Sequence, residues 1–560
     1  MDEKTIHQRR WWILSVLVIC LLVVILDNTI LNVALKTVQA DLDASQSQMQ
    51  WAVDSYALVF AGLLITWGVL GDRLGRKKVL LFGMLAFGAT SALCSFANSP
   101  TTLILFRALM GIGAAAVQPQ TLSIIQNVFE PHERPKAIGI WAGASGMAIA
   151  LGPIAGGALL KYFWWGSIFL VNVPIVIVGV VAIVFLVPDS KNPRPGRLDP
   201  FGVLLSMVAL VVLVYGVIEG GNTNEWLRWN SLGAILLGVV LLALFVRSQA
   251  RSTHPTIDVS LFRNRHFSAG VGAIGVTFFA LMGATFYLAY FLQAVRGYTA
   301  LAAGVALIAV AGAVMVAAPL SARLSARFGP RTVTAAGLAI FGLTMMSYGL
   351  ATRTMPQWVI EIMMVGFGVG MGLVMTPATN AIMSAVPREK AGAGSAVNNT
   401  VRQVAGALGV AILGSLLAVV FRSHLGADTP AQLANRLDQP AAVVSTLPAD
   451  AQVNTYVRKD ASESIGGSLE YAGKAAGALQ NRPGTPTSQQ RAQAQQAIGG
   501  FVDKSKDSFM SAMRVASVVS GLFGLLGAVG AFLFLPNRRE HADQTAGAPG
   551  APSGEPAMAH

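Results

Sequence analysis

Charged side chains are scarce in this sequence. Of its 560 residues, 12% are Asp, Glu, Lys or Arg, whereas 54% are hydrophobic. A soluble globular domain carries about 25% charged residues, so about half of the expected charge is missing. The charge that is present lies between long apolar runs, which excludes a chain of several soluble domains and indicates an integral membrane protein.

Cysteine is rarer still, and the motifs of common enzyme classes are missing. Cys20 and Cys94 are the two cysteines, and both lie inside apolar runs, so neither a disulfide framework nor a zinc site follows from them. The sequence has no GxxxxGKS/T nucleotide loop, zincin helix or serine-nucleophile elbow. We therefore expect a protein that is not an enzyme, uses no ATP and needs no cofactor or metal.

Fourteen apolar stretches, each near the ~20 residues that cross a ~30 Å hydrocarbon core, follow one another along the chain. The first has no cleavage site of small residues and is expected to remain as a helix. The stretches lie at 12–34, 52–71, 79–97, 102–125, 137–160, 167–187, 201–218, 231–246, 267–292, 301–320, 332–351, 357–384, 400–420 and 512–535.

Basic residues are distributed unequally over the loops. With the N-terminus in the cytoplasm, 23 Lys and Arg fall in cytoplasmic segments and five in short outer loops, namely Lys36, Lys161, Arg228, Arg296 and Arg353. This bias predicts an even number of spans, with both termini cytoplasmic, in a multi-pass protein of the bacterial inner membrane. Membrane topology thus explains the net charge of +13, and we expect no nucleic-acid partner.

A faint internal repeat divides the chain. Arg73, Gly75 and Lys77 recur 254 residues later as Arg327, Gly329 and Arg331, and parallel six-helix repeats characterise one large transporter architecture. We predict an N-terminal six-helix bundle at 1–190, a linker with two extra spans at 191–250, and a C-terminal six-helix bundle at 251–540. The last includes a long extracytoplasmic loop at 421–508, either a partner-binding cap or a poorly ordered connection, and 541–560 is predicted to be a disordered tail.

The loop after the second span reads Gly68-Val69-Leu70-Gly71-Asp72-Arg73-Leu74-Gly75-Arg76-Lys77-Lys78. Glycines permit a tight turn and close helix approach, and Asp72 can pair with a basic residue or face a helix N-terminus. At these residues the sequence resembles the major facilitator superfamily. The resemblance implies an all-α integral membrane fold of two six-helix bundles, here with two extra transmembrane helices (14 in total). It also implies a conformational switch made of Gly68, Asp72, Arg73, Gly75 and Arg76.

The fifth span is rich in glycine. Such small residues let helices pack closely in lipid, and a proline interrupts the helical hydrogen bonds. Placed after the loop motif, this span resembles the antiporter motif of the superfamily's drug exporters, which implies export. The residues that carry the motif are Gly146, Gly152, Pro153, Gly156 and Gly157.

An acidic residue lies in the first span and an arginine in the fourth. The segment from Leu26 to Leu35, LDNTILNVAL, is similar to the acidic motif of the fourteen-helix drug:proton antiporters, the multidrug and quaternary-ammonium efflux type. Asp27 is therefore our candidate proton-coupling carboxylate. Arg107 does not release its own proton, but it stabilises an ionised carboxyl beside it. In the alternative, its side chain extends to the interface between membrane and water.

Three further residues are candidate substrate contacts: Asp54, Asn28 and Gln118. Asp54 would bind a cationic substrate, act as a second proton site, or stabilise the N-terminus of its own helix. Arg402 and Gln403 lead into the thirteenth span. Either they line the cytoplasmic cavity, or Arg402, as an arginine at a helix start, only sets the membrane topology.

These residues together predict proton-coupled efflux of lipophilic drugs or antibiotics across the inner membrane by alternating access. The expected partners are small lipophilic substrates, cationic ones among them, protons and the lipid bilayer. Two alternatives remain open at this point: a dedicated exporter of one endogenous metabolite, and a non-transporting membrane sensor or partner protein.

Overall fold

The computed structural model describes residues 3–42, 44, 46–191, 199–223, 226–252, 255, 259–298, 300–426, 465, 468–469, 472–473 and 488–535. Within these ranges the protein is built from helices and contains no strand. A helix is the natural solution for such apolar segments, because it satisfies every backbone hydrogen bond internally where lipid offers no partner. Most of the predicted loop at 421–508, and the whole tail at 541–560, lie outside the described residues.

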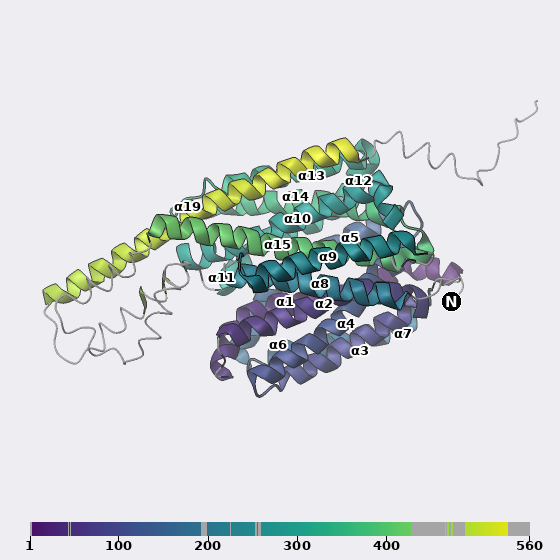
Figure 1. The fold of residues 1–560 in the computed structure, drawn as a ribbon, viewed down its shortest axis with the longest axis horizontal. Helices are drawn as coiled ribbons and strands as arrows, with labels where there is room; N and C mark the ends of the chain where they lie inside the picture. The colour runs from purple at the N-terminus through teal and green to yellow at the C-terminus, as the bar shows by residue number, and fades with distance from the viewer. Residues whose placement is uncertain are drawn as a thin grey trace, which may run out of the picture.

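The first half of the chain forms one body, drawn in purple and blue (Figure 1). Within it α2 and α3 both pack against α4, and α1 packs against α5 and α7. Local sequence sets the helix starts: α4 begins at Pro100, and the hydroxyl of Ser99 caps it by accepting a hydrogen bond from the Thr102 backbone N–H at 3.3 Å. The helices are α1 (Glu3–Asp41), α2 (Gln46–Leu74), α3 (Arg76–Ser95), α4 (Pro100–Val128), α5 (Arg134–Tyr162), α6 (Ser167–Leu170) and α7 (Asn172–Leu186).

Two helices follow before the second body begins. They are α8 (Pro200–Thr223) and α9 (Ala234–Arg251), the latter entered through a π-helical turn, η1 (Trp229–Gly233). They pack against each other, and α8 also contacts α2 of the first half and α15 of the second. The indole N–H of Trp226, after α8, donates to the Ser415 hydroxyl at 2.7 Å. The extra pair is thus held at the border between the two halves.

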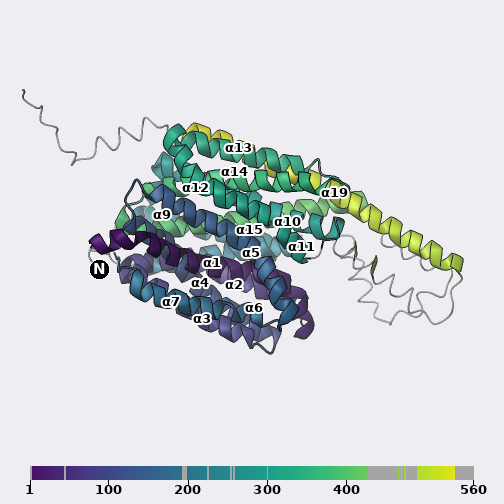
Figure 2. The same ribbon diagram turned by 180° about the vertical axis from the view of Figure 1, so that it is seen from behind.

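The second half forms the other body, drawn in teal, green and yellow (Figures 1 and 2). Here α12 packs against α14, α13 against α14 and α19, and α10 against α15. The elements are η2 (Val259–Arg263), α10 (Arg265–Tyr290), η3 (Phe291–Val295), α11 (Ala300–Ala306), α12 (Ile308–Phe328), α13 (Pro330–Tyr348), α14 (Gln357–Ser384), η4 (Arg388–Lys390), α15 (Ala391–Leu425) and α19 (Ser488–Phe534).

Twelve helices in the described part of the chain are long and apolar enough to cross a membrane. They include the short predicted span at 231–246, which lies in the candidate span Trp229–Arg251. The segments predicted at 137–160 and 332–351 correspond to α5 of the first body and α13 of the second, which are not among the twelve. The multi-pass membrane fold is therefore confirmed, and the count of fourteen spans stays a prediction.

The start of α1 and the end of α19 lie at the same end of the bundle, which we call the terminal end (Figure 1). At the opposite end α19 continues past the other helices as a projecting rod (Figures 1 and 2). Its 47 residues make a helix of about 70 Å, more than twice the ~30 Å hydrocarbon core. Arg353, after α13, holds this projecting part through ion pairs with Asp503 at 3.0 Å and Asp507 at 2.6 Å.

The internal repeat is visible as a shared turn. Gly75 between α2 and α3, and Gly329 between α12 and α13, both have positive φ, +109° and +87°. L-residues with a side chain rarely adopt this region, so each loop needs its glycine to reverse the chain. The carboxylate does not recur, because Ala326 stands where the first copy has Asp72.

At the terminal end, Arg10 of α1 donates through Nη2 to Oε1 of Glu133, in the loop before α5, at 2.9 Å. This hydrogen bond holds the pKa of Glu133 below its ordinary value of 4.5. A depressed carboxyl pKa adds stability above the unfolded value that is lost as pH falls through the folded one. We expect Glu133→Gln to cost at most about 1 kcal/mol at pH 7, with the difference from wild type vanishing in acid.

Thermal unfolding of the purified wild-type and Glu133→Gln chains between pH 3 and 7 measures this difference. A gap between the two chains that is independent of pH would show that Glu133 acts through packing and not through its charge.

Candidate functional site

Asp27 and Arg107, predicted from separate spans, form an ion pair inside the first bundle. The Nη1 atom of Arg107 on α4 lies 2.5 Å from Oδ2 of Asp27 on α1, and the side chains are 0% and 1% exposed. Arg107 also donates from Nε to the backbone carbonyl of Ala52 on α2 at 3.2 Å, and its guanidinium lies 4.3 Å from the ring centre of Tyr56. The alternative in which Arg107 extends to the interface is therefore wrong.

Neighbouring polar groups complete this cluster. The amide of Asn172, the first residue of α7, donates to Oδ1 of Asp27 at 3.0 Å and to the Ser91 hydroxyl at 3.1 Å. Ser91 on α3 in turn donates to the backbone carbonyl of Phe169 at 2.8 Å. The cluster thus ties together α1, α2, α3, α4 and the α6–α7 region at one buried carboxylate.

A buried pair of this kind is costly to build. Two charges lose their hydration, and removal of one partner leaves the other without a counter-charge. Ionisable side chains inside membrane spans are rare for this reason, and they mark ion or substrate pathways by default. One Arg107 nitrogen, Nη2, is buried and has no hydrogen-bond partner. Protonation of the Asp27 carboxylate would therefore leave the positive charge of Arg107 without its counter-charge.

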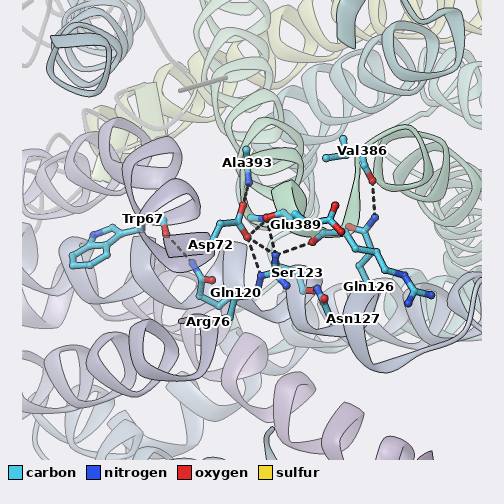
Figure 3. A network of polar contacts seen from close by, with 12 residues as sticks. Trp67, Asp72, Arg76, Gln120, Ser123, Gln126, Asn127, Val386, Glu389 and Ala393 are labelled. Atoms are coloured by element: carbon cyan, nitrogen blue, oxygen red, sulfur yellow. Dashed lines mark hydrogen bonds and ion pairs between the residues drawn. The ribbon is translucent and has the colours of Figure 1, made fainter. Parts of the chain in front are cut away.

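A second cluster joins the two bundles at the terminal end (Figure 3). Asp72, at the end of α2, accepts hydrogen bonds from Arg76 Nε at 2.9 Å and from the backbone N–H groups of Gly392 and Ala393 at 2.9 and 3.1 Å. Arg76 also donates to the backbone carbonyl of Arg388 at 2.8 Å. One carboxylate thus both pairs with an arginine and caps the N-terminus of α15, where the helix dipole favours negative charge.

The helices at this cluster approach so closely that only glycine fits. A Cβ on Gly68 would lie 2.5 Å from the backbone oxygen of Gly392 and 2.6 Å from the Ala396 Cβ. On the same side, the Gln126 amide of α4 donates to the carbonyl of Met383, in the last turn of α14, at 2.6 Å and to that of Val386, just after α14, at 3.0 Å (Figure 3). The terminal ends of the two bundles are therefore closed against each other. Among the described contacts, Arg73 takes no part in this cluster.

The glycine-rich α5 packs against helices of both bundles. Gly139 and Gly146 face α12, where a Cβ would meet the Ala318 carbonyl oxygen at 2.9 Å and the Val314 side chain at 2.6 Å. Gly152 and Gly156 face Thr29 and Ile30 of α1. Gly157 lies next in the chain, half-buried, and the Pro153 side chain is outside those described. The prediction of close packing is confirmed for α5; its role in transport remains a prediction.

The predicted substrate contacts are on α1, α2 and α4. Asn28 and Asp54 are half-buried, and Oε1 of Gln118 is buried with no hydrogen-bond partner. Since α2 begins at Gln46 and not near residue 52, Asp54 lies in its third turn. The helix dipole acts mainly within the first turn, so the alternative in which Asp54 stabilises its own helix start is wrong.

Sequence reasoning missed three of these contacts: Asn172, Ser91 and the N-terminus of α15. An asparagine at the head of the very apolar run 172–186 was the available signal for the first. Within the described residues, no group of three or more His, Cys, Asp or Glu side chains is arranged to hold a metal ion.

Comparison with known proteins gives one family throughout. The sequence matches the Major Facilitator Superfamily over residues 17–410. It is 37% identical to the multidrug efflux pump LfrA of Mycolicibacterium smegmatis, over 79% of this chain and 88% of that protein. It is 34% identical to the methyl viologen resistance protein SmvA of Salmonella typhimurium, over 74% and 84%. To the tetracenomycin C resistance and export protein of Streptomyces glaucescens it is 32% identical, over 73% and 76%.

Solved structures show the same fold at much lower identity. The human organic anion transporter MFSD10 (TETRAN) aligns over 74% of this chain and 94% of its own, with a TM-score of 0.53 and 14% identity. A bacterial homologue of the human lysosomal transporter Spinster, inward-facing and unoccupied, aligns over 94% and 99%, with a TM-score of 0.51 and 16% identity. These likenesses bear on the fold alone.

Proposed function

Because this chain belongs to the Major Facilitator Superfamily, we propose that it is a proton-coupled exporter of small lipophilic drugs or antibiotics. Relatives at 32–37% identity are named as a multidrug efflux pump, a methyl viologen resistance protein and an antibiotic export protein. The observation that carries the proposal is the buried Asp27–Arg107 pair, because a titratable carboxylate inside a membrane bundle supplies the coupling site that a proton-driven pump requires.

The proposed topology has fourteen spans, six in each bundle and two between them, with α5 and α13 crossing the membrane together with the twelve more apolar helices. Both termini are placed in the cytoplasm, in accord with the excess of basic residues at 73–78, 134–136 and 388–390. The terminal end is then the cytoplasmic end, and the described arrangement is closed toward the cytoplasm.

In the proposed cycle Asp27 is the proton carrier. When its carboxylate is ionised, Asp27 balances the charge of the Arg107 guanidinium. When a proton from outside neutralises Asp27, the buried positive charge of Arg107 has no counter-charge and favours a rearrangement of α1 against α4. Protonation in the outward-open state releases substrate, and proton loss to the cytoplasm permits reloading. Asp54, Asn28 and Gln118 are the proposed substrate contacts.

The Asp72–Arg76 cluster with Gly68 and Gly75 would set the balance between the access states, since its hydrogen bonds to η4 and to the start of α15 exist only while the cytoplasmic ends are closed. Arg73 would contribute positive charge beside it. The α5 glycines Gly146, Gly152, Gly156 and Gly157, with Pro153, would let the bundles rock over a tight interface.

A second candidate is a dedicated exporter of one endogenous metabolite. It is favoured by the relative named for resistance to and export of a single antibiotic, tetracenomycin C. The two candidates differ in the number of different compounds they export, and one efflux panel measures this number.

The test is a panel of dyes and antibiotics in a bacterial host deleted for its own pumps, with and without a protonophore. We expect the full chain to lower the accumulation of several unrelated lipophilic compounds, and the protonophore to abolish the effect. Export of a single compound would favour the dedicated exporter. Export that persists with the proton gradient collapsed would contradict proton coupling.

A further inference from the structure

A second arginine, Arg402 of α15, is buried between the bundles, and no carboxylate among the described residues pairs with it. Because α15 begins at Ala391, Arg402 lies 11 residues into the helix, about 16 Å from its start and well within the membrane. Its exposed fraction is 6%. The alternative in which Arg402 stands at a helix start and serves topology is therefore wrong.

Groups from three other helices enclose the Arg402 guanidinium. Its Cζ lies 4.9 Å from the ring centre of Trp141 on α5 and 5.1 Å from that of Phe278 on α10. Its Nη2 donates to the Thr379 hydroxyl on α14 at 3.1 Å. Trp141 belongs to the first bundle and the others to the second, so Arg402 lies where transporters of this architecture bind their substrates, at the interface of the repeats near the midplane.

Among the described residues, no carboxylate balances the charge of Arg402. None of the ion pairs among the described residues includes Arg402, whereas the similarly buried Arg107 has Asp27. Aromatic rings offset part of the cost of burying a cation, but they do not accept hydrogen bonds in the plane of the guanidinium. The Arg402 Nε is buried and has no partner.

A second group without partners lies one turn away. Asn398 is 0% exposed, and neither its Nδ2 nor its Oδ1 has a hydrogen-bond partner. Residues four apart share one helix face, so its amide lies on the side of α15 that carries Arg402. An orphaned buried amide costs free energy that a bound ligand would recover.

We propose that Arg402 and Asn398 form a subsite for the carboxylate of an aromatic substrate, with Trp141 and Phe278 as its apolar walls. The inference rests on the proposed function and adds a substrate class to it: aromatic acids and zwitterions as well as neutral or cationic drugs. A carboxylate matches the paired N–H groups of Nε and Nη2, which bind it in a fork, and the Asn398 amide supplies a further donor.

The test compares two dyes with the same ring system, rhodamine 110, which carries a free carboxylate, and rhodamine 123, its methyl ester. Binding to the purified full chain is followed by fluorescence anisotropy, without a proton gradient. We expect Arg402→Gln to weaken binding of rhodamine 110 by about tenfold or more and that of rhodamine 123 by less than about threefold. Arg402→Lys should fall between, because lysine keeps the charge but loses the fork.

Arg323→Gln, the same change at an exposed arginine of α12, is the matched control and should alter neither affinity. An equal loss for both dyes in Arg402→Gln would show a packing role and overturn the subsite. Unchanged binding of rhodamine 110 in Arg402→Gln would show that Arg402 does not bind the carboxylate and would overturn the subsite too. A wild-type chain that binds rhodamine 110 through Arg402 but exports neither dye would contradict the proposed export and leave the subsite standing.

Discussion

Asp27→Asn is expected to abolish proton-driven efflux and to destabilise the protein. The amide keeps the shape of the carboxyl but neither titrates nor balances Arg107, which is 0% exposed. Leaving a buried charge without its partner typically costs about 3–5 kcal/mol. Dye efflux by cells and thermal unfolding of the purified chain measure the two losses.

The double variant Asp27→Asn/Arg107→Gln separates the two roles of the pair. Removing both charges restores a neutral cluster, so most of the lost stability should return, as it does when buried ion pairs are replaced as a unit. Efflux driven by a pH gradient should not return, because the proposed proton carrier, the Asp27 carboxylate, is absent. A double variant that still exports dye in a protonophore-sensitive way would remove Asp27 from the coupling mechanism.

Gly68→Ala is expected to shift the protein away from the state closed at the terminal end. The added Cβ would overlap the Gly392 carbonyl oxygen and Ala396, which belong to the other bundle. Overpacking of this kind costs about 1–3 kcal/mol in the closed state only, which changes the ratio of the two states by about 5- to 150-fold. Transport should slow, because one half of the cycle becomes unfavourable.

Spin labels at Lys78 and Ser384, in a chain with Cys20 and Cys94 replaced, would report this shift as a longer distance between the terminal ends of the bundles. The control is Gly272→Ala on α10, where a Cβ meets nothing within 4 Å. It should change neither the distance nor transport. A Gly68→Ala chain with the wild-type distance distribution would contradict a role for this contact in closure.

Hydropathy and loop charge were enough to predict a multi-pass helical bundle, because a backbone inside lipid must satisfy its hydrogen bonds internally and a helix does so within one segment. Helix starts were harder to predict. α2 begins at Gln46 and α15 at Ala391, each earlier than the apolar stretch predicts. Helical hydrogen bonding continues through polar flanks that hydropathy counts as loop, which is why Asp54 and Arg402 were misplaced at helix starts.

The partners of the candidate residues were only partly predictable. Asp27 and Arg107 were each predicted as proton-coupling residues, and their pairing only on the condition that the two helices bring them together. Asp72 was predicted to face either a basic residue or a helix N-terminus, and it faces both. That the helix would be α15, and that Asn172 would bind Asp27, depends on how helices distant in sequence pack together. No local pattern in the sequence carries that information.

Proton–drug exchange is the central claim, and everted membrane vesicles test it most directly. Vesicles that contain the full chain are acidified by respiration, and the internal pH is followed with a quenched acridine dye. Adding rhodamine 123 to wild-type vesicles should release protons and restore fluorescence, and vesicles with Asp27→Asn should give no response. Uptake of rhodamine 123 by wild-type vesicles without proton release would contradict the account.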